Sequence, residues 1–110
     1  MARLTADLWV SAYLTRLRLS DIPAFVTRKG DATAGAVMVK LNTLDGQAKA
    51  FQREFNILED RRDWAVLAEG DERDVDAALS KQASFDPDLW IIEVEDRQGR
   101  SLLDEPGLSD

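Results

Sequence analysis

The sequence contains neither cysteine nor histidine, and these two absences exclude several classes of chemistry. Without cysteine the chain cannot form a disulfide, a thiolate nucleophile, a zinc ribbon or an iron–sulfur site. Without histidine it lacks the usual general base near neutral pH, which excludes Ser-His-Asp triads, HExxH metalloproteases and histidine phosphotransfer. Any catalysis would have to use carboxylates, lysines, hydroxyl groups or the single tyrosine, Tyr13.

Proline, glycine and long apolar runs are also scarce. The 110 residues include three Pro and six Gly, with 45% hydrophobic and 32% charged residues, which is typical of one ordinary globular domain. We expect a single domain over residues 1–104 and a flexible tail over residues 105–110. No segment approaches the roughly 18 apolar residues of a membrane span, and the N-terminus lacks the apolar core of a signal peptide. A cytoplasmic location is therefore expected.

Charge is unevenly distributed along the chain. The net charge of -7 combines eight basic and five acidic residues up to Leu58 (+3) with six basic and sixteen acidic residues from Glu59 onward (-10). A strongly acidic half repels nucleic acid, whereas the first half could attract an anion. The simpler interpretation is a charged surface that keeps the protein in solution.

Two amphipathic helices are predicted. The first, over residues 5–20, has an apolar stripe at helical spacing: Ala6, Val10, Tyr13, Leu14 and Leu17. Trp9 lies away from that stripe, so we expect it to be exposed and to mark a surface for a protein partner or a homodimer. The second helix begins after Asp71, a suitable N-cap, and ends before Asp86-Pro87.

The remaining apolar segments predict strands. Alternating or short buried runs occur at residues 24–28, 35–42, 47–57, 64–68, 89–95 and 100–103. A helix is the alternative over residues 47–57, because its apolar positions also fit a helical period. The first four strands predict an antiparallel meander, and the last two a hairpin across the turn Asp96–Gly99. The expected fold class is α+β: a mostly antiparallel sheet with two helices packed on it.

An acidic cluster is the first candidate site. Five of the sixteen residues in FDPDLWIIEVEDRQGR, from Phe85 to Arg100, are carboxylates. Asp88, Glu93 and Glu95 could hold Mg²⁺ or Ca²⁺ through oxygen ligands. The alternative is structural: turn residues before the strand, and the solvated face of a strand whose other face carries Trp90, Ile92 and Val94.

A basic group is the second candidate, as a surface for an anion or a partner. A meander could bring its members together: Arg28, Lys29, Lys40, Lys49 and Arg53. Aromatic residues for base stacking are missing beside them, so nucleic-acid binding is not expected. The alternative is that these cations protect sheet edges.

Three segments resemble a known family: Trp9–Ala12, Gly35–Asn42, and Phe85–Trp90 continuing through Glu93–Arg97. They are similar to an uncharacterised alphaproteobacterial family of small proteins, the domain of unknown function numbered fourteen ninety-one. The resemblance covers nearly the whole chain. It implies a bacterial cytoplasmic protein and no mechanism, cofactor or catalytic residue.

The sequence therefore favours a small non-enzymatic binding or accessory protein that acts through a surface, with no cofactor. The alternative is a divalent-cation-dependent enzyme that uses Asp88, Glu93 and Glu95 on a phosphorylated or nucleotide substrate. A concave pocket around these acids would favour the enzyme, and a flat acidic surface beside exposed apolar residues would favour the binding protein.

Overall fold

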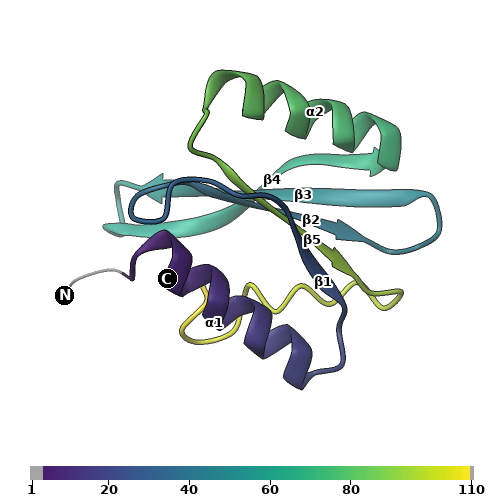
Figure 1. The fold of residues 1–110 in the computed structure, drawn as a ribbon, viewed down its shortest axis with the longest axis horizontal. Coiled ribbons are helices and arrows are strands. Elements are labelled where there is room, and N and C mark those ends of the chain that lie inside the picture. Colours follow the sequence, from purple (N-terminus) through teal and green to yellow (C-terminus); the bar gives the residue numbers. More distant parts are fainter. Residues whose placement is uncertain (1–3, 110) are drawn as a thin grey trace.

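The computed structural model describes residues 4–109 and shows two helices on opposite faces of a five-stranded sheet (Figure 1). Its elements are α1 (Ala6–Leu19), β1 (Ala24–Arg28), β2 (Val37–Asn42), β3 (Gln47–Asn56), β4 (Arg61–Asp71), α2 (Glu72–Phe85) and β5 (Trp90–Glu95). The predicted α+β class is confirmed. The sheet is mixed, because β5 runs parallel to β2 while the other neighbouring pairs are antiparallel.

The apolar core has two parts, one on each face of the sheet. Helix α1 buries Tyr13 and Leu17 against alternate residues of the central strands, including Ile92. Helix α2 packs Val75 and Leu79 on the other face. Alternate side chains of β5 contribute to the two parts of the core, because successive side chains of a strand point to opposite faces. Burying both faces of the sheet removes the central strands from solvent.

The predicted order of strands is wrong. Strand order is β1-β5-β2-β3-β4, so β5 lies between β1 and β2, which an antiparallel meander would have paired directly. The physical reason is burial: β5 has apolar residues on both faces, which suits a central strand, whereas the middle of β1 is exposed. The β3–β4 hairpin and α2 provide the long connection that a parallel pair requires.

The predicted returning strand at residues 100–103 is also wrong. The turn itself forms, with the Gly99 amide donating to the Asp96 carbonyl at 3.0 Å, but the chain then continues without regular structure. Both edges of β5 are already paired, with β1 and β2. A returning strand would therefore have no free edge of β5 to pair with.

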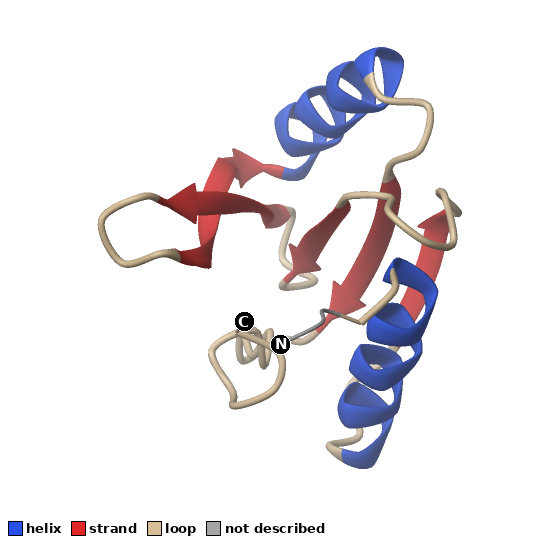
Figure 2. Ribbon diagram, turned by 90° about the vertical axis from the view of Figure 1, so that its left-hand side faces the viewer, coloured by secondary structure: helices blue, strands red, loops and turns tan. Residues whose placement is uncertain are grey.

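Several local predictions are confirmed. The Asp71 carboxylate accepts a hydrogen bond from the Arg73 amide at 2.9 Å and caps α2 as expected. Residues 47–56 form a strand, so the helical alternative is excluded. Strand β4 begins at Arg61, earlier than the predicted Trp64, because long cross-strand pairing with β3 extends it. The turn end of the β3–β4 hairpin extends away from both helices (Figure 2).

Candidate functional site

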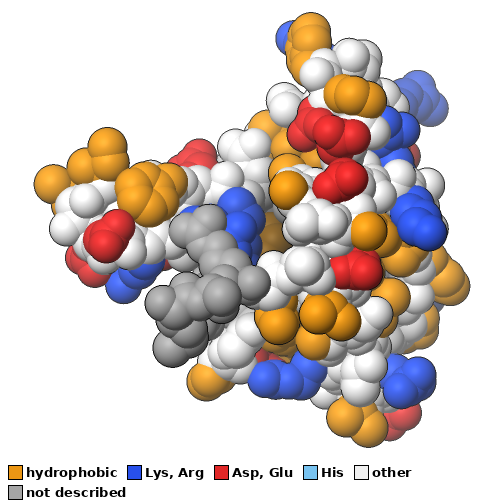
Figure 3. Space-filling model, turned by 60° about the vertical axis from the view of Figure 1, so that its left-hand side comes forward, with side chains coloured by type: hydrophobic (Ala, Val, Ile, Leu, Met, Phe, Trp, Pro, Cys, Tyr) orange, Lys and Arg blue, Asp and Glu red, His pale blue; other side chains and the backbone are white. Residues whose placement is uncertain are grey.

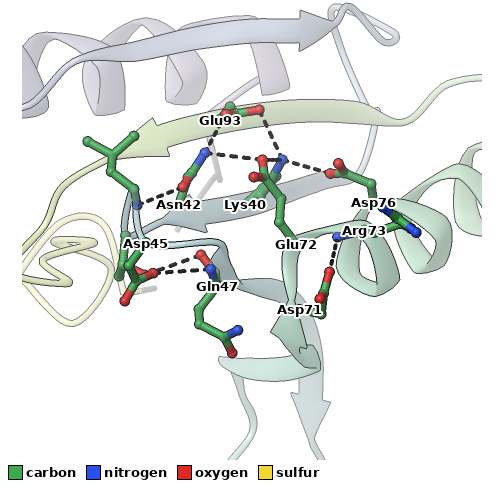
Figure 4. A network of polar contacts seen from close by, with 11 residues as sticks. Lys40, Asn42, Asp45, Gln47, Asp71, Glu72, Arg73, Asp76 and Glu93 are labelled. Atoms are coloured by element: carbon green, nitrogen blue, oxygen red, sulfur yellow. Dashed lines mark hydrogen bonds and ion pairs between the residues drawn. The ribbon is translucent and has the colours of Figure 1, made fainter.

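A polar cluster lies between the sheet and α2, centred on Lys40 (Figure 4). Strand β2 supplies Lys40 and Asn42, the neighbouring β5 supplies Glu93 opposite Lys40, and the first turns of α2 supply Glu72 and Asp76. The Lys40 ammonium lies 2.6 Å from the Glu72 carboxylate and 2.7 Å from that of Asp76. It lies 3.4 Å from the Glu93 carboxylate. The Lys40 side chain is only 6% exposed.

The electrostatics of this cluster keep Lys40 protonated. Burial alone would lower the pKa of Lys40, but hydrogen bonds to Asp76 and Glu72 and the charge of Glu93 outweigh it and raise the pKa above its ordinary value. Glu72 and Asp76 accept hydrogen bonds from the ammonium, and Glu93 adds a third negative charge at 3.4 Å. Lys40 is therefore a cation at neutral pH, and its ion pairs join α2 to the sheet.

Asn42 completes the network. Its amide nitrogen donates to Glu72 at 3.1 Å and to Glu93 at 3.3 Å, while its amide oxygen accepts from the Leu44 backbone at 2.8 Å. Sequence reasoning missed the roles of Asn42, Glu72 and Asp76. The sequence contained one signal: Lys40 and Asn42 alternate with Val39 and Leu41, so the two polar side chains share one face of the strand. The structure buries that face as well as the apolar one.

Within the described residues the three acids predicted as cation ligands, Asp88, Glu93 and Glu95, are not gathered into one group. Glu93 faces Lys40, whereas Glu95 lies at the far end of β5, roughly 16 Å along the strand from Trp90 at ~3.3 Å per residue. Asp88 precedes that strand at its opposite end. Among residues 4–109, no group of three acidic side chains is placed to hold a metal ion.

The acids before β5 have structural roles. The Asp86 carboxylate accepts a hydrogen bond from the Asp88 amide at 3.0 Å, which stabilises the turn that ends α2. The Asp88 carbonyl then accepts from the Asp31 amide at 3.0 Å. The Trp90 indole donates to the Asp31 carbonyl at 2.8 Å. A Cβ on Gly30 would overlap the backbone of Asp88 and Leu89. The loop before β2 can therefore approach this segment closely only with glycine at position 30.

The structure separates the five basic residues predicted as an anion surface: Arg28, Lys29, Lys40, Lys49 and Arg53. Lys40 pairs with Ala50 on the α2 face, whereas Lys49 pairs with Leu41 on the α1 face. Arg28 lies on β1, at the other edge of the sheet from β4. The alternation of β2 and β3 explains this division, because neighbouring residues point to opposite faces. These cations do not form one anion-binding surface.

The expectation that Trp9 is exposed is wrong. Trp9 is only 7% exposed, with its ring centroid 5.0 Å from that of Tyr13 and 5.5 Å from that of Trp64. The sequence contained the signal, since Trp9 lies three residues after Ala6 and four before Tyr13, which is the spacing of one helix face. A partner surface on Trp9 is therefore not proposed.

The C-terminal segment is docked against the sheet, which differs from the flexible tail that the sequence predicts over residues 105–110. Arg53 donates to the backbone carbonyls of Ser109 at 2.8 Å and Leu108 at 3.1 Å, and the Trp64 indole also donates to Leu108 at 3.1 Å. The Arg53 guanidinium stacks on the Trp64 ring at 4.2 Å. Leu108 is 2% exposed. Cation–π stacking and carbonyl acceptors together hold this segment in place.

A surface hollow of about 890 Å³ lies beside this segment, between the C-terminal loop and β3–β4. It is lined by residues 99–105 with Phe51, Asp63, Trp64 and Ser109. None of the acids predicted as metal ligands contributes to it. The pocket that would have favoured an enzyme using Asp88, Glu93 and Glu95 is therefore not found here.

Asp96, at the end of β5, binds Arg100 across the turn. Its carboxylate accepts from the Arg100 backbone at 2.7 Å and from the guanidinium at 3.0 and 3.1 Å. These contacts, chiefly the guanidinium hydrogen bond, hold the pKa of Asp96 below its ordinary value despite the opposing effect of burial.

We expect the Asp96 pKa to rise in an Arg100→Gln variant and to stay low in an Arg97→Gln control. Because the folded-state pKa is depressed, the stabilisation by Asp96 is complete above the unfolded value near 3.8 and is lost as the pH falls through the folded-state pKa. Carboxyl chemical shifts followed by NMR from pH 2 to 6 measure both variants. An unchanged Asp96 titration in Arg100→Gln would contradict the assignment.

The end of the β3–β4 hairpin carries the most exposed apolar side chains. We call this projecting end the arm, residues 53–66. Leu58 is 94% exposed and Ile57 is 80% exposed at the turn, with Phe55 and Val66 also exposed on the strands beside them. Figure 3 shows hydrophobic side chains gathered at the projecting end of the molecule. Water-exposed apolar clusters of this kind are typical of interaction surfaces.

Sequence patterns did not identify the arm, because strand periodicity does not show which end of a hairpin lies beyond the rest of the sheet. Among the described helices none is long and apolar enough to cross a membrane. The arm carries the two most exposed large apolar side chains of the described residues, Leu58 and Ile57.

Comparison with known proteins agrees with this fold. The chain is similar to a crystal structure of a DUF1491 family protein from Caulobacter crescentus CB15, with 41% identity over 94% of this chain and 95% of that chain and a TM-score of 0.82. An NMR structure of a DUF1491 family protein from the same organism shares 40% identity over 96% of this chain and 97% of that chain, with a TM-score of 0.83.

A more distant relative is protein Atu0922 from A. tumefaciens, whose solution structure shares 26% identity over 86% of each chain, with a TM-score of 0.72. No curated protein matches the chain. The family model described as "Protein of unknown function (DUF1491)" matches residues 4–104. The chain therefore belongs to the DUF1491 family, for which no function is assigned.

Proposed function

We propose that this protein is a non-enzymatic binding protein that attaches to another protein through its arm. The observation that carries the proposal is the pair of apolar residues at the turn of the arm, Ile57 and Leu58, which are 80% and 94% exposed. Leaving two such side chains in water forgoes about 1.5–3 kcal/mol of burial energy for each of them. A protein partner with an apolar pocket would recover that energy.

The position of the arm supports the same proposal. Strands β3 and β4 pair at ten positions, from Gln47 opposite Asp71 to Asn56 opposite Arg61, with one register shift between Ala50 and Phe51. From Phe51 to the turn the pairing is unbroken. A preorganised hairpin loses little conformational entropy on binding. Arg61 forms ion pairs with Glu59 at 3.1 Å and Asp63 at 2.9 Å, which surround the apolar turn with a polar rim. An apolar centre with a polar rim is the usual anatomy of a protein interface.

The test is a capture experiment from a lysate of the source cells, followed by binding measurements with the purified partner. The arm variant is Ile57→Ser/Leu58→Ser. The matched control is Leu19→Ser/Phe85→Ser, which removes two apolar side chains of similar exposure, 76% and 73%, at the ends of the two helices. We expect the native chain and the control to retain the same protein, and the arm variant to bind it about 10- to 100-fold more weakly.

Two results would contradict the proposal. One is equal affinity of the arm variant and the native chain for the purified partner. The other is a capture experiment in which the native chain retains no protein in near-stoichiometric amounts. Circular dichroism of all three proteins checks that the substitutions leave the fold intact.

A further inference from the structure

We propose that two copies of this chain associate by antiparallel pairing of their β4 strands, which would join the two sheets into one. Strand β4 is the last strand in the sheet, and among the described strands it pairs only with β3. It is eleven residues long. An edge strand presents backbone N–H and C=O groups that can pair with another strand.

The two edges of the sheet differ in how well they are protected. Strand β1 has five residues and a register shift between Val26 and Arg28. Strand β4 also has a register shift, after Val66, but it is eleven residues long and contains a run of five apolar residues, WAVLA from Trp64 to Ala68, with no lysine and no proline. Short length protects an edge from pairing, whereas a long apolar edge favours it. The β4 edge is therefore the one available for pairing.

The charges of β4 identify the occupant as a second copy. The strand begins with two basic residues, Arg61 and Arg62, and ends with acidic Glu69 and Asp71. Within the chain Arg61 pairs with Asp63, and Glu69 forms an exposed pair with Lys49. Antiparallel pairing of two identical strands brings the basic start of each beside the acidic end of the other. A strand with this charge pattern is thus complementary to itself, as a two-fold symmetric interface requires.

We propose a register with the two-fold axis at Ala65, using the faces that the ladder between β3 and β4 sets. Val66, Trp64 and Arg62 pair with alternate residues of β3 and so share one face of the sheet. A bulge in β4 follows Val66, because Phe51 pairs with Val66 while Ala50 pairs with Ala68. With the two-fold axis at Ala65, Val66 lies opposite the second copy's Trp64. The bulge then brings Arg62 opposite the second copy's Glu69.

The interface is small, since one strand pair and the side chains beside it form most of the contact. Interfaces of this size belong to the weak class, and we expect a dissociation constant of about 10–100 µM. The paired residues include the base of the arm but not its turn, whereas the proposed protein partner depends on Ile57 and Leu58 at the turn, so the two proposals can fail separately.

The experiment is sedimentation velocity of the full chain from about 5 to 500 µM, with Arg62→Glu and Glu69→Arg as variants. The native chain should change from the 12.3 kDa monomer to a dimer of twice that mass over this range. Each variant alone places like charges opposite each other at both ends of the interface, so each should weaken the dimer at least 10-fold.

An equimolar mixture of the two variants provides the decisive control. In the mixed dimer, one chain carries Arg62→Glu and the other carries Glu69→Arg. The acidic substitution of the first chain then faces the basic substitution of the second. The second charge pair of that dimer is the native pair of Arg62 and Glu69. Because both pairs then join opposite charges, we expect the mixture to dimerise about as well as the native chain.

Two outcomes overturn the proposal: a native chain that stays monomeric at 500 µM, and a dimer whose dissociation constant neither charge reversal changes. The Ile57→Ser/Leu58→Ser variant should dimerise like the native chain, because the turn of the arm lies outside the paired strands. This variant therefore separates failure of the dimer from failure of the proposed protein partner.

Discussion

Replacement of Lys40 with methionine should lower the free energy of unfolding by about 2–3 kcal/mol, or the melting temperature by roughly 10 °C. The substitution keeps the apolar stem of the side chain but leaves three carboxylates converging without a cation. Loss of one partner from a fully buried ion pair costs about 3–5 kcal/mol. Here the carboxylates of Glu72 and Asp76 are 36% and 53% exposed, so water partly compensates and the expected cost is smaller.

Chemical denaturation at neutral pH measures this effect, with Lys49→Met as the matched control. Lys49 forms an exposed pair with Glu69, at 3.2 Å, and its loss should cost less than about 0.5 kcal/mol. Adding Glu93→Gln to Lys40→Met removes the least exposed of the three carboxylates and should restore about 1 kcal/mol. Equal costs for Lys40→Met and Lys49→Met would show that the cluster contributes nothing beyond a surface ion pair.

The pH dependence of the Lys40 effect has a definite sign. The folded-state pKa is raised above the ordinary value of 10.5, so the folded protein binds this proton more tightly than the unfolded chain does. The stabilisation by Lys40 is therefore complete below about pH 10.5 and is lost as the pH rises through the folded-state pKa. The difference in stability between the native chain and Lys40→Met should be constant between pH 7 and 9 and should shrink in more alkaline solution.

Replacement of Leu108 with alanine should destabilise the protein by about 2–3 kcal/mol, although Leu108 lies near the end of the chain. Its side chain is 2% exposed and belongs to the core under α1. A buried Leu→Ala substitution usually costs about 2–5 kcal/mol, and a terminal segment can relax enough to place this one in the lower half of that range.

Thermal and urea unfolding measure the Leu108 effect, with Leu58→Ala as the control. Leu58 is 94% exposed, so its truncation should change stability by less than about 0.5 kcal/mol. Removal of residues 105–110 should cost at least as much as Leu108→Ala, because Arg53 and Trp64 would also lose their carbonyl acceptors. A truncated protein as stable as the native chain would restore the interpretation of this segment as a free tail.

Local patterns were sufficient for most of the secondary structure. The helical stripe of residues 6–17 and the cap at Asp71 predict the two helices, and the alternation of Trp90, Ile92 and Val94 predicts the strand and one of the two faces that it buries. These features depend on residues three or four apart in a helix, or two apart in a strand. The same local logic gave the correct structural interpretation of Asp86 and Asp88 as turn residues.

Contacts between distant residues determined the rest, and no local pattern contained them. The insertion of β5 between β1 and β2 brings Glu93 beside Lys40, which is 53 positions away in the chain, and so decides that this carboxylate neutralises a buried cation. The docking of Leu108 depends on Arg53 and Trp64 in the same way. Sequence periodicity specifies which face of an element is apolar, but burial and charge pairing between elements decide which elements meet. For this protein those long-range contacts give the candidate site residues structural roles and leave the arm and the β4 edge as the surfaces available for binding.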